Sequence, residues 1–166
     1  FGADMATGMY ARKPSVAQMQ PETATADALK KNIALLTEMV ETHPDTTFKF
    51  FFSPYSMLWW DNAYRTGELD SVIYNEKQTV KALLAYDNVE IYYYQDAKEI
   101  ITNLDLYMDM IHFSKDINYW VYDKLAKGED RLTVENYEER LDGMRALSDE
   151  IVRNEIPKFY KNGDSE

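Results

Sequence analysis

The stretch that most constrains the architecture reads Phe48-Lys49-Phe50-Phe51-Phe52-Ser53-Pro54. Its apolar run is short and aromatic, which favours a strand over a helix. Apolar side chains at consecutive positions suit a strand that is covered on both faces, as in a parallel sheet. A second stretch of this kind, Val89 to Tyr94, follows a turn at Asp87-Asn88. The two stretches predict neighbouring strands of a parallel α/β sheet.

Apolar residues at helical spacing predict helices around these strands. Pro44 ends the first of them, Ser114 is the expected N-cap of a later one, and Lys127-Gly128 is its expected end. No such spacing occurs in residues 1–24, which we expect to form an extended arm or loop. The predicted helices cover residues 25–42, 55–65, 70–86, 114–127 and 133–154.

Composition excludes several classes of function. The 166 residues carry 18 basic and 29 acidic side chains, a net charge of −11, which disfavours binding to nucleic acid or to an anionic membrane surface. The chain has no cysteine and therefore no disulfide or thiolate metal site. It has two histidines and no calcium-loop spacing, so we expect neither a metal nor a cofactor. No apolar run approaches the roughly 20 residues of a membrane span.

The chemical signal lies in Asp109-Met110-Ile111-His112-Phe113-Ser114, between the second strand and a helix. Ligands of open parallel sheets bind at the carboxyl ends of the strands. A single turn can bring the Asp109 carboxylate to the His112 imidazole, where it would accept the Nδ1 proton and leave Nε2 free for general base catalysis. The pattern predicts a catalytic His–Asp pair.

In order and spacing these segments resemble the C-terminal half of SGNH/GDSL-type hydrolases and their acyltransferase relatives. In that superfamily a strand ending in proline, a crossover helix and a last strand precede Asp-x-x-His; here Phe50 to Pro54, Val89 to Tyr94 and Asp109 to Ser114 correspond. The resemblance covers residues 25–127. It implies a three-layer, flavodoxin-like parallel sheet that is incomplete in this chain, with residues 25–166 as the C-terminal portion of one domain.

The resemblance also implies a function and shows what this chain lacks. The family is composed of serine esterases and O-acyltransferases that act on acyl esters, here with a cell-surface glycan as the implied acyl carrier, and related bacterial members lie outside the membrane. Its nucleophile and oxyanion-hole blocks are absent from this sequence. Gly163-Asp164-Ser165 repeats the nucleophile block in letters only, without a preceding strand, and we reject it. We therefore expect the chain to be inactive alone and to need the missing N-terminal half of the domain as its partner.

Three aromatic residues after the first strand, Tyr55, Trp59 and Trp60, could line a substrate groove or simply pack a helix against its neighbours. The missing nucleophile leaves two further hypotheses open. One is a non-catalytic binding or scaffolding domain of the same fold, and the other is an acidic helical interaction module unrelated to these hydrolases.

Overall fold

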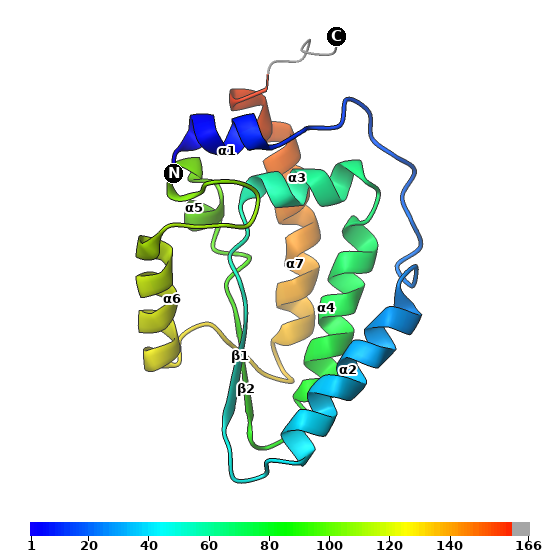
Figure 1. Ribbon diagram of the computed structural model, residues 1–166. Helices are drawn as coiled ribbons and strands as arrows, with labels where there is room; N and C mark the ends of the chain where they lie inside the picture. The colour runs from blue at the N-terminus through cyan, green and yellow to red at the C-terminus, as the bar shows by residue number, and fades with distance from the viewer. Residues whose placement is uncertain (161–166) are drawn as a thin grey trace.

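A computed structural model describes residues 1–160 of the chain. Its centre is a small mixed sheet, in which β1 (Phe48–Phe52) lies parallel to β2 (Val89–Tyr93) and β3 (Arg131–Leu132) lies antiparallel to β2 (Figure 1). The register aligns Phe48 with Val89 and Phe52 with Tyr93. Both predicted strands and their parallel pairing are confirmed. The expectation that both strands are covered on both faces is wrong for β1, because Lys49 and Phe51 are exposed on one face of it. The antiparallel β3 was not predicted, because two residues are too short to show a period.

Seven α-helices surround the sheet in the part of the chain that the structure describes. In Figure 1, α2, α4 and α7 lie on one side of β1 and β2, α6 lies on the other, and α3 crosses the end where both strands finish. The protein is thus mixed α/β. The helices are α1 (Ala3–Met9), α2 (Ala26–Glu41), α3 (Met57–Arg65), α4 (Leu69–Leu83), α5 (Lys98–Ile101), α6 (Lys115–Lys127) and α7 (Tyr137–Glu150), with helical turns at Leu104–Leu106, Ile151–Glu155 and Ile156–Lys158.

The structure differs from the prediction at both ends of the chain. Residues 3–9 form α1 rather than an extended arm, because Ala6 and Tyr10 bury their side chains and the Gly2 N–H donates to the Tyr107 carbonyl. Only the segment after α1 runs as an arm, which crosses over to α2 (Figure 1). The last helix begins at Tyr137, four residues later than predicted, since Thr133 and Asn136 form a turn after β3.

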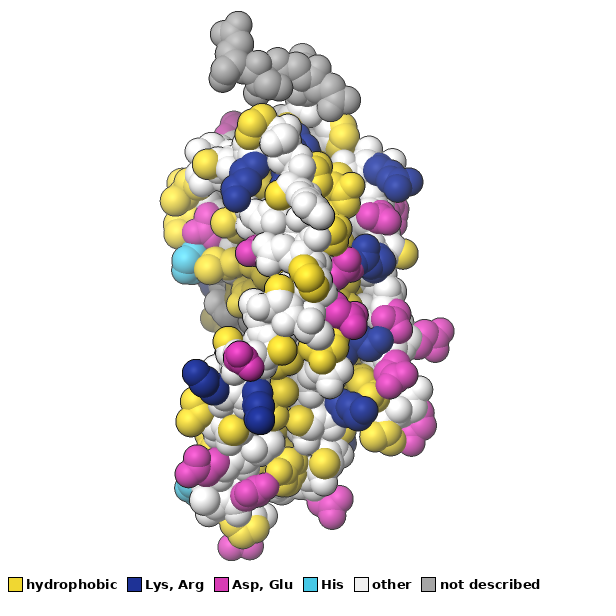
Figure 2. Space-filling model, turned by 90° about the vertical axis from the view of Figure 1, so that its right-hand side faces the viewer, with side chains coloured by type: hydrophobic (Ala, Val, Ile, Leu, Met, Phe, Trp, Pro, Cys, Tyr) yellow, Lys and Arg dark blue, Asp and Glu magenta, His cyan; other side chains and the backbone are white. Residues whose placement is uncertain are grey.

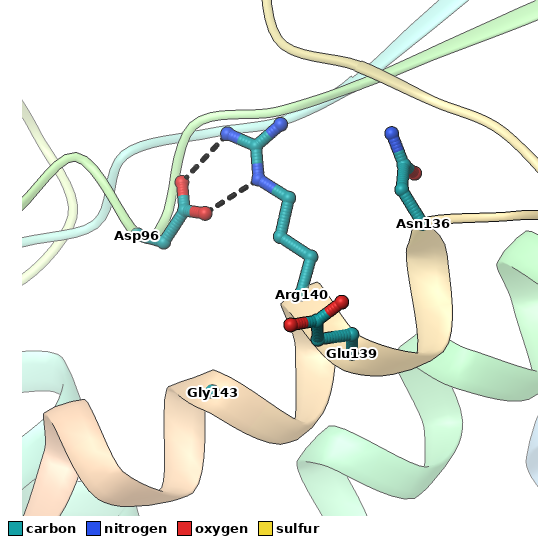
Figure 3. A pocket seen from close by; sticks show the side chains of 5 residues that line it. All are labelled: Asp96, Asn136, Glu139, Arg140 and Gly143. Atoms are coloured by element: carbon teal, nitrogen blue, oxygen red, sulfur yellow. Dashed lines mark hydrogen bonds and ion pairs between the residues drawn. The ribbon is translucent and has the colours of Figure 1, made fainter.

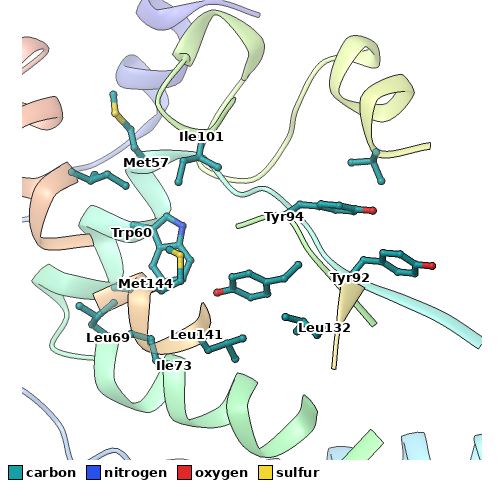
Figure 4. Packing of buried hydrophobic residues seen from close by; sticks show 14 of the residues in the cluster. Met57, Trp60, Leu69, Ile73, Tyr92, Tyr94, Ile101, Leu132, Leu141 and Met144 are labelled. Atoms are coloured by element: carbon teal, nitrogen blue, oxygen red, sulfur yellow. The ribbon is translucent and has the colours of Figure 1, made fainter. Parts of the chain in front are cut away.

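The core lies between β2 and the α3, α4 and α7 helices. Tyr92, Tyr93 and Tyr94 are all buried, so every face of this strand end is covered. Figure 4 shows Trp60 beside Met144 of α7, with Leu69 and Ile73 below them. The buried apolar side chains of α7, Tyr137, Leu141 and Met144, belong to the same core, as does Ile151 directly after the helix. This packing fixes α3, and with it the loop that leaves β1.

The surface carries both charges and apolar side chains. On the face shown in Figure 2, acidic and basic side chains alternate with yellow apolar ones, and no part of it is uniformly basic. Two of the exposed apolar side chains of the molecule, Leu35 and Met39, belong to α2. Within residues 1–160, no helix combines the length and the apolar character that crossing a membrane would need.

Candidate active site

The Asp109–His112 pair forms in the structure as the sequence predicts. Nδ1 of His112 lies 2.6 Å from Oδ2 of Asp109. The second carboxylate oxygen, Oδ1, accepts the backbone N–H of Ile111 at 2.8 Å and that of His112 at 2.7 Å, so the Asp109 side chain caps its own turn. The imidazole is 63% exposed and the carboxylate 21% exposed. The ring therefore has an open face toward solvent.

The environment of Asp109 sets the protonation of the pair. Burial opposes ionisation of Asp109, but the N–H groups of His112 and Ile111, with the imidazole, hold the pKa of the carboxyl below its usual value. An ionised carboxylate can only accept, so Nδ1 must be the donor. In the neutral ring Nε2 then carries the lone pair, which is the tautomer that general base catalysis requires.

The turn that bears the pair is closed by backbone hydrogen bonds. Tyr107 and Phe113 form an antiparallel bridge, and the Met108 N–H donates to the His112 carbonyl at 2.9 Å. One residue further on, the Ser114 N–H donates to the Leu106 carbonyl at 2.8 Å. Asp109 and His112 thus lie in the short loop of a hairpin-like segment, ahead of α6.

The loop after β1 meets this turn. Ser56 donates both its backbone N–H, at 3.0 Å, and its hydroxyl, at 2.9 Å, to the Met110 carbonyl. The hydroxyl of Tyr107 donates to the Pro54 carbonyl at 2.6 Å. The carboxyl end of β1 and the Asp109–His112 turn are therefore adjacent, although about fifty residues separate them in the sequence.

The three aromatic residues named as substrate-binding candidates have different surroundings. Tyr55 and Trp59 are partly exposed, with ring centroids 5.4 Å apart. Trp60 is completely buried and its indole N–H has no partner within the described residues, so this side chain belongs to the core and cannot line a surface groove. Tyr55 follows Pro54 and precedes Ser56, both of which contact the turn that bears the pair.

No serine of the loop after β1 has the environment of a nucleophile. Ser56 is fully buried and its hydroxyl donates to a carbonyl, which makes it a structural residue. Ser53 is partly exposed at the end of β1, and no hydrogen bond in residues 1–160 activates its side chain. Gly163-Asp164-Ser165, rejected above, lies outside the described residues.

A second polar cluster, which the sequence did not reveal, surrounds Arg140 of α7. Its guanidinium binds the Asp96 carboxylate through two hydrogen bonds of 2.5 and 2.9 Å, and it also contacts Asp130 and the Tyr93 carbonyl. Figure 3 shows the Asp96–Arg140 pair beside a pocket of about 410 Å³ that Asn136 and Glu139 also line. Because the hydrogen bonds of the guanidinium are all directed to these partners, we interpret the cluster as a structural contact that holds α7 against the ends of β2 and β3.

Ligands for a metal ion do not gather anywhere in residues 1–160: no group of three or more histidine, aspartate or glutamate side chains is placed to hold one.

Comparison with known proteins adds no family, since no family model, no curated protein and no solved structure matches the chain. The resemblance to SGNH/GDSL-type hydrolases therefore remains a prediction from the motifs, and so do the roles of Asp109 and His112.

Proposed function

We propose that this chain supplies the histidine and aspartate of the active site of an SGNH/GDSL-like serine esterase or O-acyltransferase. The supporting observation is the 2.6 Å contact between Nδ1 of His112 and Asp109, with the imidazole open to solvent at the carboxyl end of a parallel strand pair. The open ring distinguishes His112 from a structural histidine that is buried in the core, and the hydrogen bond on Nδ1 sets which ring nitrogen carries the proton.

In the proposed reaction, Nε2 of His112 takes the proton of a serine hydroxyl as the serine oxygen attacks the ester carbonyl. Asp109 stabilises the imidazolium that forms. The tetrahedral intermediate then expels the alcohol, which receives the proton from Nε2, and an acyl-serine remains. Water, or a hydroxyl of an acceptor such as a surface glycan, repeats these steps in reverse to release the acyl group. No cofactor takes part.

The serine and the oxyanion-hole donors would come from the N-terminal half of the same domain, outside this sequence. The free edge of β1 supports this part of the proposal. The Phe48 N–H bonds to Asn88 and the Phe52 carbonyl accepts from Tyr94, so alternate residues face β2. The N–H and C=O groups of Lys49 and Phe51 then point to the other edge, where β1 pairs with no strand of residues 1–160. A further parallel strand would satisfy them.

Assay of the complete gene product on p-nitrophenyl acetate tests the proposal. His112→Ala should lower kcat/KM by about 10³-fold or more, and Asp109→Asn by about 10²–10⁴-fold because it removes the carboxylate that orients the ring. His43→Ala is the matched control, since His43 is the other histidine and follows α2 at the opposite end of β1. Unchanged hydrolysis by His112→Ala would reject the assignment.

A non-catalytic binding domain of the same fold is the second candidate. The observation that favours it is the partly exposed Tyr55–Trp59 pair close to the turn, together with the structural role of Ser56. Aromatic rings of this kind stack on sugars and other flat apolar groups. If the complete gene product binds an acylated glycan but hydrolyses no ester, with or without His112, the binding function is the correct one.

A further inference from the structure

Tyr107 makes a well-defined side-chain contact between the Asp109–His112 segment and the sheet. The residue is completely buried, and its hydroxyl donates to the Pro54 carbonyl at 2.6 Å, directly beyond β1. Burial raises the pKa of the phenol well above its usual value, so the hydroxyl remains a donor wherever the protein is folded. The ring packs edge-on against Phe113, with centroids 6.4 Å apart.

The position of Tyr107 in the chain gives this contact its importance. Tyr107 precedes Asp109 by two residues, and its backbone bridges Phe113, which follows His112 directly. The Tyr107 side chain and its backbone bridge to Phe113 therefore connect both ends of the segment that bears the pair to the loop after β1. The Tyr107 carbonyl also accepts the N–H of Gly2, at the start of α1, at 3.0 Å.

A second contact holds the middle of the segment. Met110 lies between Asp109 and His112, and its carbonyl accepts two hydrogen bonds from Ser56. Both contacts are made with the same short loop after β1. The turn has no other hydrogen bond to that loop in the described part of the chain, apart from a longer one of 3.5 Å from the Ser56 hydroxyl to the Asp109 carbonyl.

We infer that Tyr107 is a positioning residue of the active site proposed above: its hydrogen bond to Pro54 sets the height and tilt of the Asp109–His112 turn against the carboxyl end of β1. The inference rests on the proposed function. Tyr107 is buried beneath the turn, so it touches no substrate and acts through the backbone that carries His112. Ser56, in the same loop as Pro54, holds the turn through its two hydrogen bonds to the Met110 carbonyl.

The expected effect follows from the geometry of general base catalysis. Nε2 must lie within hydrogen-bond distance of the nucleophile, and a displacement of about 1 Å can lower the rate about 10²-fold. Tyr107→Phe keeps the ring and its packing on Phe113 and removes only the hydroxyl. The turn would remain closed by its backbone bridge but would lose its tie to Pro54. We expect kcat to fall about 10- to 100-fold while KM changes less than about twofold.

The matched control is Tyr160→Phe, because the Tyr160 hydroxyl also donates to a backbone carbonyl, that of Thr7, at 3.1 Å. Both variants of the complete gene product are assayed on p-nitrophenyl acetate, and their urea unfolding is measured. A loss of kcat in Tyr107→Phe at a stability similar to that of Tyr160→Phe supports the inference. Equal kcat in the two variants contradicts it.

A second readout needs no enzymatic activity. The ¹⁵N NMR signals of His112 at about pH 9, where a free imidazole is neutral, report whether the proton lies on Nδ1 or is shared between the two nitrogens. We expect the Nδ1–H form in the wild type and a mixture of both forms in Tyr107→Phe, while the His43 signals stay unchanged. Ser56→Ala should shift the mixture in the same direction but less, because the Ser56 N–H still donates to Met110.

The kinetic assay and the NMR measurement distinguish a failure of the proposed function from a failure of the positioning role of Tyr107. If His112→Ala retains activity, the proposed function is wrong, but the NMR experiment still decides whether Tyr107 holds the pair. If His112→Ala is inactive and Tyr107→Phe keeps both the wild-type kcat and the pure Nδ1–H form, only the positioning role is wrong. If Tyr107→Phe does not fold, wild-type behaviour of Ser56→Ala in both readouts overturns the inference.

Discussion

Glu76 is a buried carboxyl in the core of the protein, and it makes a sharp prediction about stability. It lies on α4 with 8% of its surface exposed, and its Oε2 accepts a hydrogen bond of 3.0 Å from the Tyr93 hydroxyl. Burial raises the pKa of Glu76 from 4.5 to about 8, against the opposing effect of the hydrogen bonds from Tyr93 and Gln95. At neutral pH the side chain is therefore protonated in the folded protein and ionised in the unfolded chain.

The sign and size of the effect follow from proton linkage. Between the two pKa values the folded state binds one more proton, so this group stabilises the fold fully below pH 4.5 and loses that contribution as the pH rises toward about 8. The slope is about −1.4 kcal/mol per pH unit. From pH 5 to pH 7 the free energy of unfolding should fall by about 3 kcal/mol on account of Glu76 alone.

Glu76→Gln replaces the protonated carboxyl by a neutral amide of the same shape and removes this titration. Urea unfolding at pH 5, 6, 7 and 8 should show that the stability of the variant relative to wild type rises by about 1.4 kcal/mol per pH unit between pH 5 and 7, and less steeply as the pH approaches the pKa of about 8. Contributions from the two histidines cancel, since both proteins contain them. Glu99→Gln, at an exposed glutamate, is the control and should follow the wild-type curve. Parallel curves for Glu76→Gln and wild type would show that the buried carboxyl does not titrate as argued.

Two further substitutions test how the N-terminal arm is attached. Asp61 is fully buried and pairs with Arg12 at 2.8 Å, so Asp61→Ala should destabilise the protein by about 3 kcal/mol. Trypsin should then cleave the variant after Arg12 well before it cleaves the folded domain, and unchanged cleavage would contradict this role. Gly67 has φ +75°, and a Cβ there would lie 2.3 Å from the Gln18 carbonyl oxygen. Gly67→Ala should therefore lower the free energy of unfolding in urea by about 1–3 kcal/mol. An unfolding midpoint equal to that of the wild type would mean that the arm does not pass there.

Much of the secondary structure could be predicted because its signals are local. The aromatic run of β1, the apolar stripe of α7 and the Gly128 end of α6, with φ +69°, are each encoded within a few neighbouring residues. Ser114 occupies the predicted N-cap position, but its hydroxyl is buried and has no partner in the described residues, so its backbone rather than its side chain begins the helix. The α1 helix was not predicted, because the hydrogen bonds that stabilise its start are made with the Tyr107 carbonyl and the Asp105 carboxylate, which are distant in sequence.

In the candidate site, too, local contacts could be predicted from the sequence and long-range contacts could not. Asp109 and His112 are three positions apart, and this spacing was enough to predict the pair, because a single turn can bring the two side chains together. The sequence could not predict the hydrogen bonds by which Tyr107 and Ser56 hold the turn against the loop after β1. It also could not predict that Trp60 lies in the core or that Arg140 pairs with Asp96. Each of these contacts joins segments tens of residues apart, and only chain folding decides which of them meet.

Local spacing in the sequence thus sufficed for the strands, most helices and the His–Asp pair, because hydrogen-bonding periodicity and short turns depend on neighbouring residues. The depth at which a side chain lies, and so the raised pKa of Glu76 and the core position of Trp60, came from the packing of α3, α4 and α7 on the sheet. Burial is a property of the whole assembly of elements, since the same residue in the same helix is exposed or covered according to what packs against it.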